Sequence, residues 1–329
     1  MSGTERGGGR PRAIITEHLD PACAAWLAER CDVTHAPAGT PEFETHIADA
    51  DALVIRTYTK IDAALLDRAP RLRVVGRAGV GIDNIDRALC AARGVRVVYT
   101  PDANTQAVAE YVIALILDDL RPRPTVGRAI DVESWKSLRS ASIGAKQLRD
   151  CTVGILGLGR VGKRVAACLS GFATRVTYHD LLDIPVAERA GATTVGMDEL
   201  LASSDIVTVH VDDRASNRNL IDAAALSKCR DDVLLINASR GFVADPSALC
   251  AFLQAHPGAR AVLDVHQPEP PGAVHPLMGL ANCRLLPHLG AATAEAHRNM
   301  SWVVRDVWRV LSGEQPEHEA PPPGATMAT

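Results

Sequence analysis

The sequence predicts an α/β protein with two parallel-sheet domains, one inserted into the other. Short apolar segments of the kind found in buried parallel strands alternate with helical segments along nearly the whole chain. The length of 329 residues suits two domains of ordinary size. A glycine-rich turn between a strand and a helix begins only at residue 157, after several strand-like segments, so a second sheet starts there.

The first third of the chain alternates strands and helices before that turn is reached. Helices fit between the strands, for example at residues 21–30 and 63–68. The predicted strands cover residues 13–15, 52–55, 72–75 and 95–98. Because parallel strands need crossover connections, this alternation indicates a parallel sheet covered by helices.

The remaining segments predict a second sheet and a return of the chain to the first domain. Residues 106–120 form a helix that is apolar on nearly every side, which indicates burial at a domain junction or a subunit interface. A helical segment from residue 293 to about residue 311 is expected to rejoin the first domain. Further strands are predicted near residues 153–156, 175–178, 206–209, 233–236 and 261–263. The predicted domains are residues 1–103 with 289–329, and residues 104–288.

The glycine-rich turn has the order of a dinucleotide-binding unit. Gly157, Gly159 and Gly162 follow an apolar strand and open a helix, and a second strand ends just before Asp180, roughly 20 residues later. Gly157 permits the tight turn, Gly159 lets a diphosphate approach the backbone, and Gly162 lets the helix pack on the strand. The carboxylate of Asp180 would accept from the adenosine ribose and repel a ribose phosphate. The larger domain is therefore predicted to be a Rossmann fold that binds NAD.

Composition argues against several other classes of protein. The net charge of −4, with no long basic run, gives no support for nucleic-acid binding. The longest apolar run, residues 112–117, is too short for a membrane span, and the N-terminus has no apolar secretory segment. The eight cysteines show no Cys-x-x-Cys spacing and no Cys/His cluster, so we predict no metal site and reduced thiols in a cytoplasmic protein. The polar ends, residues 1–10 and 313–329, are predicted to be disordered.

Three later segments carry ionisable side chains where predicted strands end, at Arg240, Glu269 and His288. Loops at the carboxyl ends of parallel strands face the ligand crevice, so these loops are expected to converge. Hydride transfer to a 2-keto acid needs a cation to hold the carboxylate, a proton donor for the carbonyl oxygen, and a carboxylate to orient that donor. The three residues match these roles in kind. Each alone also has an ordinary interpretation, as a surface salt bridge, a turn residue or a loop residue.

The same segments resemble the signatures of the D-isomer-specific 2-hydroxyacid dehydrogenases, and the resemblance extends over residues 12–312. It implies that Arg240 binds the substrate carboxylate and that Glu269 pairs with His288. It also implies a Rossmann NAD-binding domain inserted into a smaller, flavodoxin-like substrate domain, and it suggests a homodimer. Asp264 would contact the nicotinamide carboxamide. The further cofactor contacts that the resemblance implies are Arg160, Val161, His210 and Ala238.

A glycine-rich segment of the first domain, residues 76–86, resembles the substrate loop of that family. Its backbone amides would form a nest for the substrate carboxylate, and nearby basic side chains would suit a phosphate or a second acidic group. The predicted substrate-binding residues are Arg56, Arg77, Val80 and Gly81. Lys60 belongs to the same cationic rim, although it is equally typical of solvated surface. These segments are closest to the phosphoglycerate dehydrogenase branch of the family.

Several positions depart from the family pattern. Asp212 stands where the family usually has a proline, and His266 stands where it usually has an aromatic residue. Ser137 follows Trp135 by two positions, where the phosphoglycerate branch often has an arginine that reaches a neighbouring subunit. Arg139 is close to that position. These differences leave the identity of the 2-hydroxy acid open.

The predicted function is hydride transfer between NAD and a small 2-hydroxy/2-keto acid, with a phosphorylated acid similar to 3-phosphoglycerate among the candidates. A reductase of glyoxylate, hydroxypyruvate or a phosphonate analogue in a specialised pathway is an alternative. Another alternative is an NAD-sensing binding protein similar to the corepressors of this superfamily, which keep the same motifs. Formate oxidation is disfavoured, because that branch has glutamine where this chain has Glu269.

Overall fold

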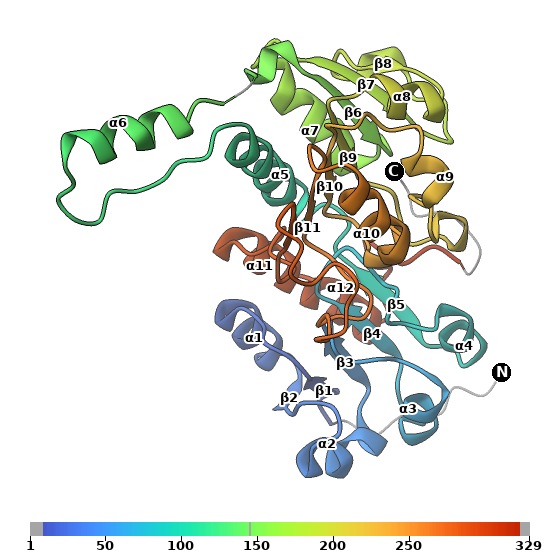
Figure 1. The fold of residues 1–329 in the computed structure, drawn as a ribbon. Helices are drawn as coiled ribbons and strands as arrows, with labels where there is room; N and C mark the ends of the chain where they lie inside the picture. The colour runs from blue at the N-terminus through green and yellow to red at the C-terminus, as the bar shows by residue number, and fades with distance from the viewer. Residues whose placement is uncertain (1–8, 145, 323–329) are drawn as a thin grey trace. The chain divides into compact units, whose positions relative to one another are not determined.

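The computed structural model describes residues 9–144 and 146–322, and the chain divides into two compact units. Among the described residues, the first unit holds 9–104 together with 293–322, and the second holds 105–144 and 146–292 (Figure 1). The predicted boundaries, after residues 103 and 288, lie one and four residues before these. Within the described residues, no helix combines the length and the apolar character that crossing a bilayer requires.

The first unit is a parallel sheet with the strand order β2-β1-β3-β4-β5. This is the flavodoxin-like order, so the predicted fold class is confirmed for this unit. Its strands are β1 Arg12–Ile15, β2 Asp32–His35, β3 Ala52–Ile55, β4 Val74–Arg77 and β5 Arg96–Tyr99. Its helices are α1 Pro21–Ala28, α2 Pro41–His46, α3 Ala63–Arg68, α4 Arg87–Ala92, α11 Ala294–Ser301 and α12 Val304–Ser312. The sequence missed β2, because this edge strand contains no run of buried apolar residues.

The C-terminal segment corrects one prediction. Residues 313–329 were expected to be disordered, but part of this segment pairs with the free edge of β5. The Tyr99 N–H donates to the His318 carbonyl at 3.1 Å, and the Ala320 N–H donates to the Val97 carbonyl at 2.8 Å. Backbone pairing along an open strand edge orders a polar segment that has no apolar pattern of its own. Residues 1–8 and 323–329 lie outside the described part of the chain.

The second unit is a parallel sheet with the order β12-β11-β10-β9-β6-β7-β8. Around β6 the order reverses as in a dinucleotide-binding Rossmann fold, which confirms the predicted class. Its strands are β6 Thr152–Leu156, β7 Arg175–His179, β8 Thr193–Thr194, β9 Ile206–Val209, β10 Leu234–Asn237, β11 Arg260–Leu263 and β12 Cys283–Leu285. Its helices are α5 Thr105–Leu120, α6 Val132–Ala141, α7 Arg160–Ser170, α8 Met197–Ser203, α9 Ala223–Leu226 and α10 Pro246–Ala255.

The apolar helix predicted at residues 106–120 is α5, which packs against α7. One face is buried, and its members are Val108, Ala109, Val112, Leu115 and Ile116. Other apolar side chains of α5, such as Ile113 and Leu117, are only half-buried in the single chain. In contrast, α6 buries no residue and stands on an extended arm away from the sheet (Figure 1).

The glycine-rich turn between β6 and α7 is fixed by close backbone packing. Gly157 has a φ of +88°, and a Cβ there would lie 2.8 Å from the His210 carbonyl oxygen. A Cβ at Gly162 would overlap the carbonyl oxygen of Gly157. By contrast, a Cβ at Gly159 would meet no atom within 4 Å, so the space beside the start of α7 is open.

Replacing Gly162 by alanine should lower the free energy of unfolding by about 1–3 kcal/mol, because α7 must move away from the turn to admit a methyl group. The matched control is Gly159→Ala, which adds the same methyl group in open space. It should cost at most about 1 kcal/mol, the value of an altered helix cap. Urea unfolding measures both. Equal losses in the two variants would contradict the packing described for this turn.

Candidate active site

The predicted catalytic segments follow three neighbouring strands at one edge of the second sheet. Strand β11 pairs with β10 on one side and with β12 on the other, and all three run parallel. Arg240 follows β10, Glu269 lies in the loop after β11, and His288 lies three residues after β12. Because parallel strands end at the same edge, the three loops are neighbours in space, as the sequence analysis expected.

Glu269 and His288 are in direct contact. The Nδ1 atom of His288 lies 3.0 Å from Oε2 of Glu269, and the second carboxylate oxygen accepts the backbone N–H of His266 at 2.8 Å. A carboxylate only accepts, so Nδ1 carries the hydrogen and Nε2 is the nitrogen that can gain or release a proton. The side chains are partly exposed, at 47% for His288 and 33% for Glu269.

The pair shifts both pKa values in the direction that favours the ion pair. The hydrogen bond to Glu269 raises the pKa of His288 against the opposing effect of burial, and the charges of Glu269 and Asp264 add to the rise. Burial alone would raise the pKa of Glu269, but the hydrogen bonds from His288 and His266 lower it overall. The pair therefore stabilises the fold most between about pH 4.3 and pH 6.5. The contribution of His288 is lost as pH rises through its raised folded pKa, and that of Glu269 is lost as pH falls through its lowered folded pKa.

Asp264 determines the shape of the loop that carries His288. Its buried carboxylate accepts the backbone N–H groups of Leu289 and Gly290, each at 2.8 Å, and the hydroxyl of Tyr111 on α5 at 3.0 Å. Its backbone carbonyl accepts the N–H of His288 at 2.9 Å. Together these bonds hold His288 at a φ of +56°, a left-handed conformation that costs a non-glycine residue free energy. The predicted contact of Asp264 with a nicotinamide carboxamide stays a prediction.

Arg240 is held in an extended backbone conformation after β10. The side chain of Asn237 ties this turn together, because its amide donates to the Arg240 carbonyl and its oxygen accepts from Ser239. The Arg240 guanidinium donates to the Ser239 carbonyl at 2.8 Å, and its positive charge opposes protonation of His288. The three predicted side chains are thus on adjoining loops, and a hydrogen bond joins Glu269 to His288.

The loops after β6 and β7, at the carboxyl ends of the same parallel sheet, provide the surroundings expected for a dinucleotide. Asp180 accepts the N–H of Leu158 at 2.7 Å and the N–H of Leu182 at 2.9 Å, so its carboxylate lies beside the glycine-rich turn. Helix α7 begins at Arg160 with Gly159 as its N-cap and no side-chain cap, and the space beside Gly159 is open. Exposed helix N-terminal amides with open space fit a diphosphate. Val161 and Ala238 are half-buried.

His210 lies next to this turn in an uncharged state. Its Nε2 lies 2.9 Å from the Thr208 hydroxyl oxygen, and burial of the ring lowers its pKa to about 4. The unusual Asp212 that follows is neutralised locally, since Arg214 donates to its two carboxylate oxygens at 2.7 Å each. The sequence analysis singled out Asp212 as a departure from the family pattern but did not predict that Arg214 pairs with it.

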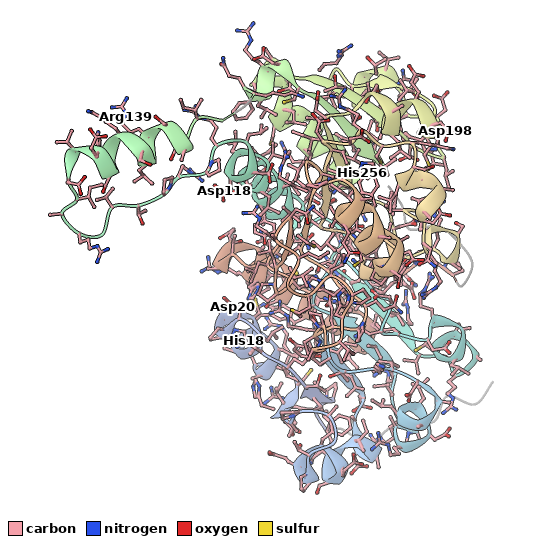
Figure 2. All side chains as sticks on the ribbon, viewed as in Figure 1. His18, Asp20, Asp118, Arg139, Asp198 and His256 are labelled. Carbon is pink, nitrogen blue, oxygen red and sulfur yellow. The ribbon has the colours of Figure 1, made fainter. Side chains whose placement is uncertain are left out.

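In the first unit, the segment of Arg56 is organised by a residue that the sequence analysis missed. The carboxylate of Glu17 accepts the backbone N–H groups of residues 56–59 at 2.8–3.1 Å. These bonds lower the pKa of Glu17 against the opposing effect of burial. Arg56 is half-buried and donates to the His18 carbonyl at 3.4 Å, while Lys60 is exposed. Figure 2 shows His18 and Asp20 just before α1.

The glycine-rich segment of the first unit follows β4. Arg77 donates to the Ala78 carbonyl at 2.9 Å, and its guanidinium covers the position that a Cβ on Gly79 would need. Val80 is half-buried and Gly81 is buried. The substrate roles of these residues stay predictions.

Comparison with known proteins decides the family. The model of the D-isomer specific 2-hydroxyacid dehydrogenase NAD binding domain matches residues 113–290. The chain belongs to this family. The predicted family and the predicted nicotinamide dinucleotide cofactor are thereby confirmed.

Individual relatives can be aligned with most of this chain. A D-3-phosphoglycerate dehydrogenase of Archaeoglobus fulgidus is 38% identical over 78% of this chain and 48% of its own length. A glyoxylate reductase of Thermofilum pendens is 35% identical over 93% of each chain. A crystal structure of an NADPH-dependent glyoxylate/hydroxypyruvate reductase from Sinorhizobium meliloti, in complex with NADP and malonate, has a TM-score of 0.79 at 28% identity and covers 95% of this chain and 97% of that one. The chain spans about half the length of the phosphoglycerate dehydrogenases it matches.

Replacing Glu269 by glutamine should move the pKa of His288 down towards its ordinary value of about 6.5, because a neutral amide does not stabilise the imidazolium. NMR titration of the histidine ring measures this without any substrate. The control is Glu133→Gln on the arm, where the carboxylate pairs with Lys136. An unchanged His288 titration in the Glu269 variant would show that the pair does not set this pKa.

Proposed function

We propose that this protein catalyses reversible hydride transfer between NAD and a small 2-hydroxy/2-keto acid. The observation that carries the proposal is the 3.0 Å contact between His288 Nδ1 and Glu269 Oε2, in a Rossmann unit of the dehydrogenase family. An imidazole oriented by a carboxylate is a suitable proton donor and acceptor near neutral pH. The relatives named as glyoxylate reductase and D-3-phosphoglycerate dehydrogenase support the same reaction class.

The chemistry divides between three side chains. When bound, the nicotinamide would supply the hydride for reduction and accept it in oxidation. In reduction, Nε2 of protonated His288 gives its proton to the carbonyl oxygen and the ring becomes neutral. In oxidation, the neutral ring takes the hydroxyl proton. Glu269 orients the ring through Nδ1 and stabilises its charged form. Arg240 holds the substrate carboxylate through a two-pronged hydrogen bond.

We propose that the substrate is a 2-hydroxy or 2-keto acid whose C2 atom carries, besides the carboxylate, a group that is either small or acidic. Arg56 and Arg77 of the first unit support an acidic group such as phosphate, and the amides around Val80 and Gly81 support a second contact to the carboxylate. Glyoxylate or hydroxypyruvate is the second candidate, because the glyoxylate reductase relative matches over nearly its whole length.

We propose NAD as the preferred cofactor over NADP. The Asp180 carboxylate lies beside the glycine-rich turn, where the adenosine ribose binds in Rossmann folds. A carboxylate there accepts from ribose hydroxyls and repels a 2′-phosphate. An NADP-dependent relative exists among the structural neighbours, so the preference needs a direct comparison of the two reduced cofactors.

The direct test is a panel of 2-keto acids assayed by loss of NADH absorbance, with NADPH run in parallel. The panel contains phosphohydroxypyruvate, hydroxypyruvate, glyoxylate, pyruvate and phosphonopyruvate. We expect turnover of at least one acid, with NADH preferred.

His288→Ala should abolish turnover while retaining NADH binding, measured by fluorescence, because the ring donates a proton and does not build the cofactor site.

The pH dependence gives the assay a second outcome to check. Reduction needs protonated His288 and oxidation needs the neutral ring, so the optimum for reduction should lie at lower pH than that for oxidation. The reverse order would contradict the assignment. NADH binding by a wild-type protein that turns over no acid would favour the corepressor-like alternative.

We propose that two copies of the chain associate through the arm that carries α6. Apolar side chains on this arm are exposed in the single chain, with Val132 at 68%, Trp135 at 49% and Ile143 at 80%. At the root of the arm a hollow of about 630 Å³ is lined by residues including Leu138 and Arg284. Arg139 also lies on α6 (Figure 2). A projecting arm and an adjacent hollow on the same chain suit exchange between two identical subunits.

The double variant Trp135→Glu with Ile143→Glu should convert a dimer into a monomer, since charges would replace the apolar contacts while α6 has no buried residue to disturb. Light scattering after size-exclusion chromatography measures the mass. The control is Val274→Glu, at a side chain that is 95% exposed but outside the arm, and it should stay dimeric. A monomeric wild type, or a dimeric double variant, would contradict the arm as the interface.

We also propose a cytoplasmic location. All eight cysteines lie within the described residues as free thiols, and burial raises the pKa of several of them, including Cys90 and Cys229, to about 11. Unpaired, unreactive thiols are typical of proteins kept in a reducing compartment.

A further inference from the structure

His266 makes two hydrogen bonds that reach different catalytic loops. It follows β11 and is 8% exposed. Its backbone N–H donates to Oε1 of Glu269 at 2.8 Å, and its ring nitrogen Nε2 lies 2.7 Å from the carbonyl oxygen of Leu286. A carbonyl oxygen only accepts, so Nε2 carries a hydrogen and donates it. One residue thus contacts the side chain of Glu269 and the backbone that leads to His288.

The ring bond connects the two halves of the Glu269–His288 pair. Leu286 precedes His288 by two residues, and Glu269 follows His266 by three. The loop that carries Arg240 also packs against His266, because a Cβ on the next residue, Gly241, would overlap the His266 carbonyl group. His266 therefore lies where the segments of all three predicted catalytic residues meet.

We propose that His266 is a positioning residue for the proposed hydride transfer, and that its ring N–H fixes the His288 segment against the Glu269 segment. This inference rests on the function proposed above. A phenyl ring at this position would fill similar space without donating to the Leu286 carbonyl. In this chain, the alignment of His288 with Glu269 depends on a polar bond.

The second nitrogen of the His266 ring allows an effect on catalysis to be distinguished from an effect on stability. This nitrogen, Nδ1, is buried and has no hydrogen-bond partner among the described residues. A buried polar atom without a partner destabilises the fold, while the bond from Nε2 stabilises it. Phenylalanine would remove both, so the thermal stability should change little even though the link to Leu286 is lost. The ring of His275 lies edge-on at 6.2 Å and offers a neighbouring control.

The test compares His266→Phe, His266→Gln and His275→Phe in the full-length protein. His266→Phe should lower kcat for keto-acid reduction by about tenfold, which equals about 1.4 kcal/mol, the size of one lost hydrogen bond. The KM for NADH and the melting temperature should stay close to wild type. His266→Gln, whose side-chain amide donates in place of Nε2, should recover most of the loss. His275→Phe should retain wild-type kcat.

NMR titration of the His288 ring gives a readout that needs no substrate. The groups whose charges act on this ring are Glu269, Asp264 and Arg240. If His266 aligns the pair, His266→Phe lowers the pKa of His288 and His266→Gln restores it. Unchanged kcat and an unchanged His288 titration in His266→Phe would overturn the proposal, as would a glutamine variant that is as impaired as phenylalanine. A wild-type protein that reduces no keto acid would refute the proposed function instead, while the titration would still test the link.

Discussion

The buried carboxylate of Asp264 is the constraint on which the geometry of the candidate site depends. Two consecutive backbone N–H groups, of Leu289 and Gly290, point at its two oxygens, and the hydroxyl of Tyr111 closes the site from α5. A buried carboxylate must have such donors, because an unpaired charge away from water is very costly. The loop after β12 therefore has little freedom, and His288 is held in a left-handed conformation that it would not adopt alone.

Short hydrogen bonds link the loop held by Asp264 to the other residues of the candidate site. His288 extends from the fixed loop to Glu269, and Glu269 is held from behind by the N–H of His266. These contacts lie in the loops that follow two adjacent strands, β11 and β12, so the paired strands fix the positions of both side chains. Such support of reacting groups by bonded neighbours is what keeps a catalytic geometry ready before substrate binds.

The parts of the fold that were predictable are those with a strong local signal. The central strands are buried on both faces and appear as continuous apolar runs, such as β3 and β10, whereas the edge strands β2 and β8 are short and polar and gave none. The turn at Gly157 was predictable because only glycine suits its positive φ and close backbone contact.

The supporting residues of the site were not predictable in the same way. Arg240, Glu269 and His288 stood out through their places after strands and through resemblance to a family, but Tyr111 looked like one more large residue of an apolar helix. Glu17 lies 39 residues before the first amide it binds, and no local pattern announces a contact of that kind. Long-range polar bonds depend on tertiary packing, so a single sequence can suggest candidate reacting groups without showing which residues hold them in place.

The differences from the family pattern are accommodated by local partners. Arg214 pairs with the carboxylate of Asp212 two residues before it, and the ring of His266 bonds to the carbonyl of Leu286 in the neighbouring loop. The fold and the predicted proton-transfer pair are thus kept while their surroundings vary.

The most direct measurement is a crystal structure of the protein with NAD and a non-reacting analogue of the 2-hydroxy acid. The account predicts that Nε2 of His288 lies within about 2.6–3.2 Å of the oxygen at C2, with the analogue's carboxylate on Arg240 and Glu269 still bonded to Nδ1. An analogue bound with its C2 oxygen away from His288, or with the Glu269–His288 bond broken, would contradict it.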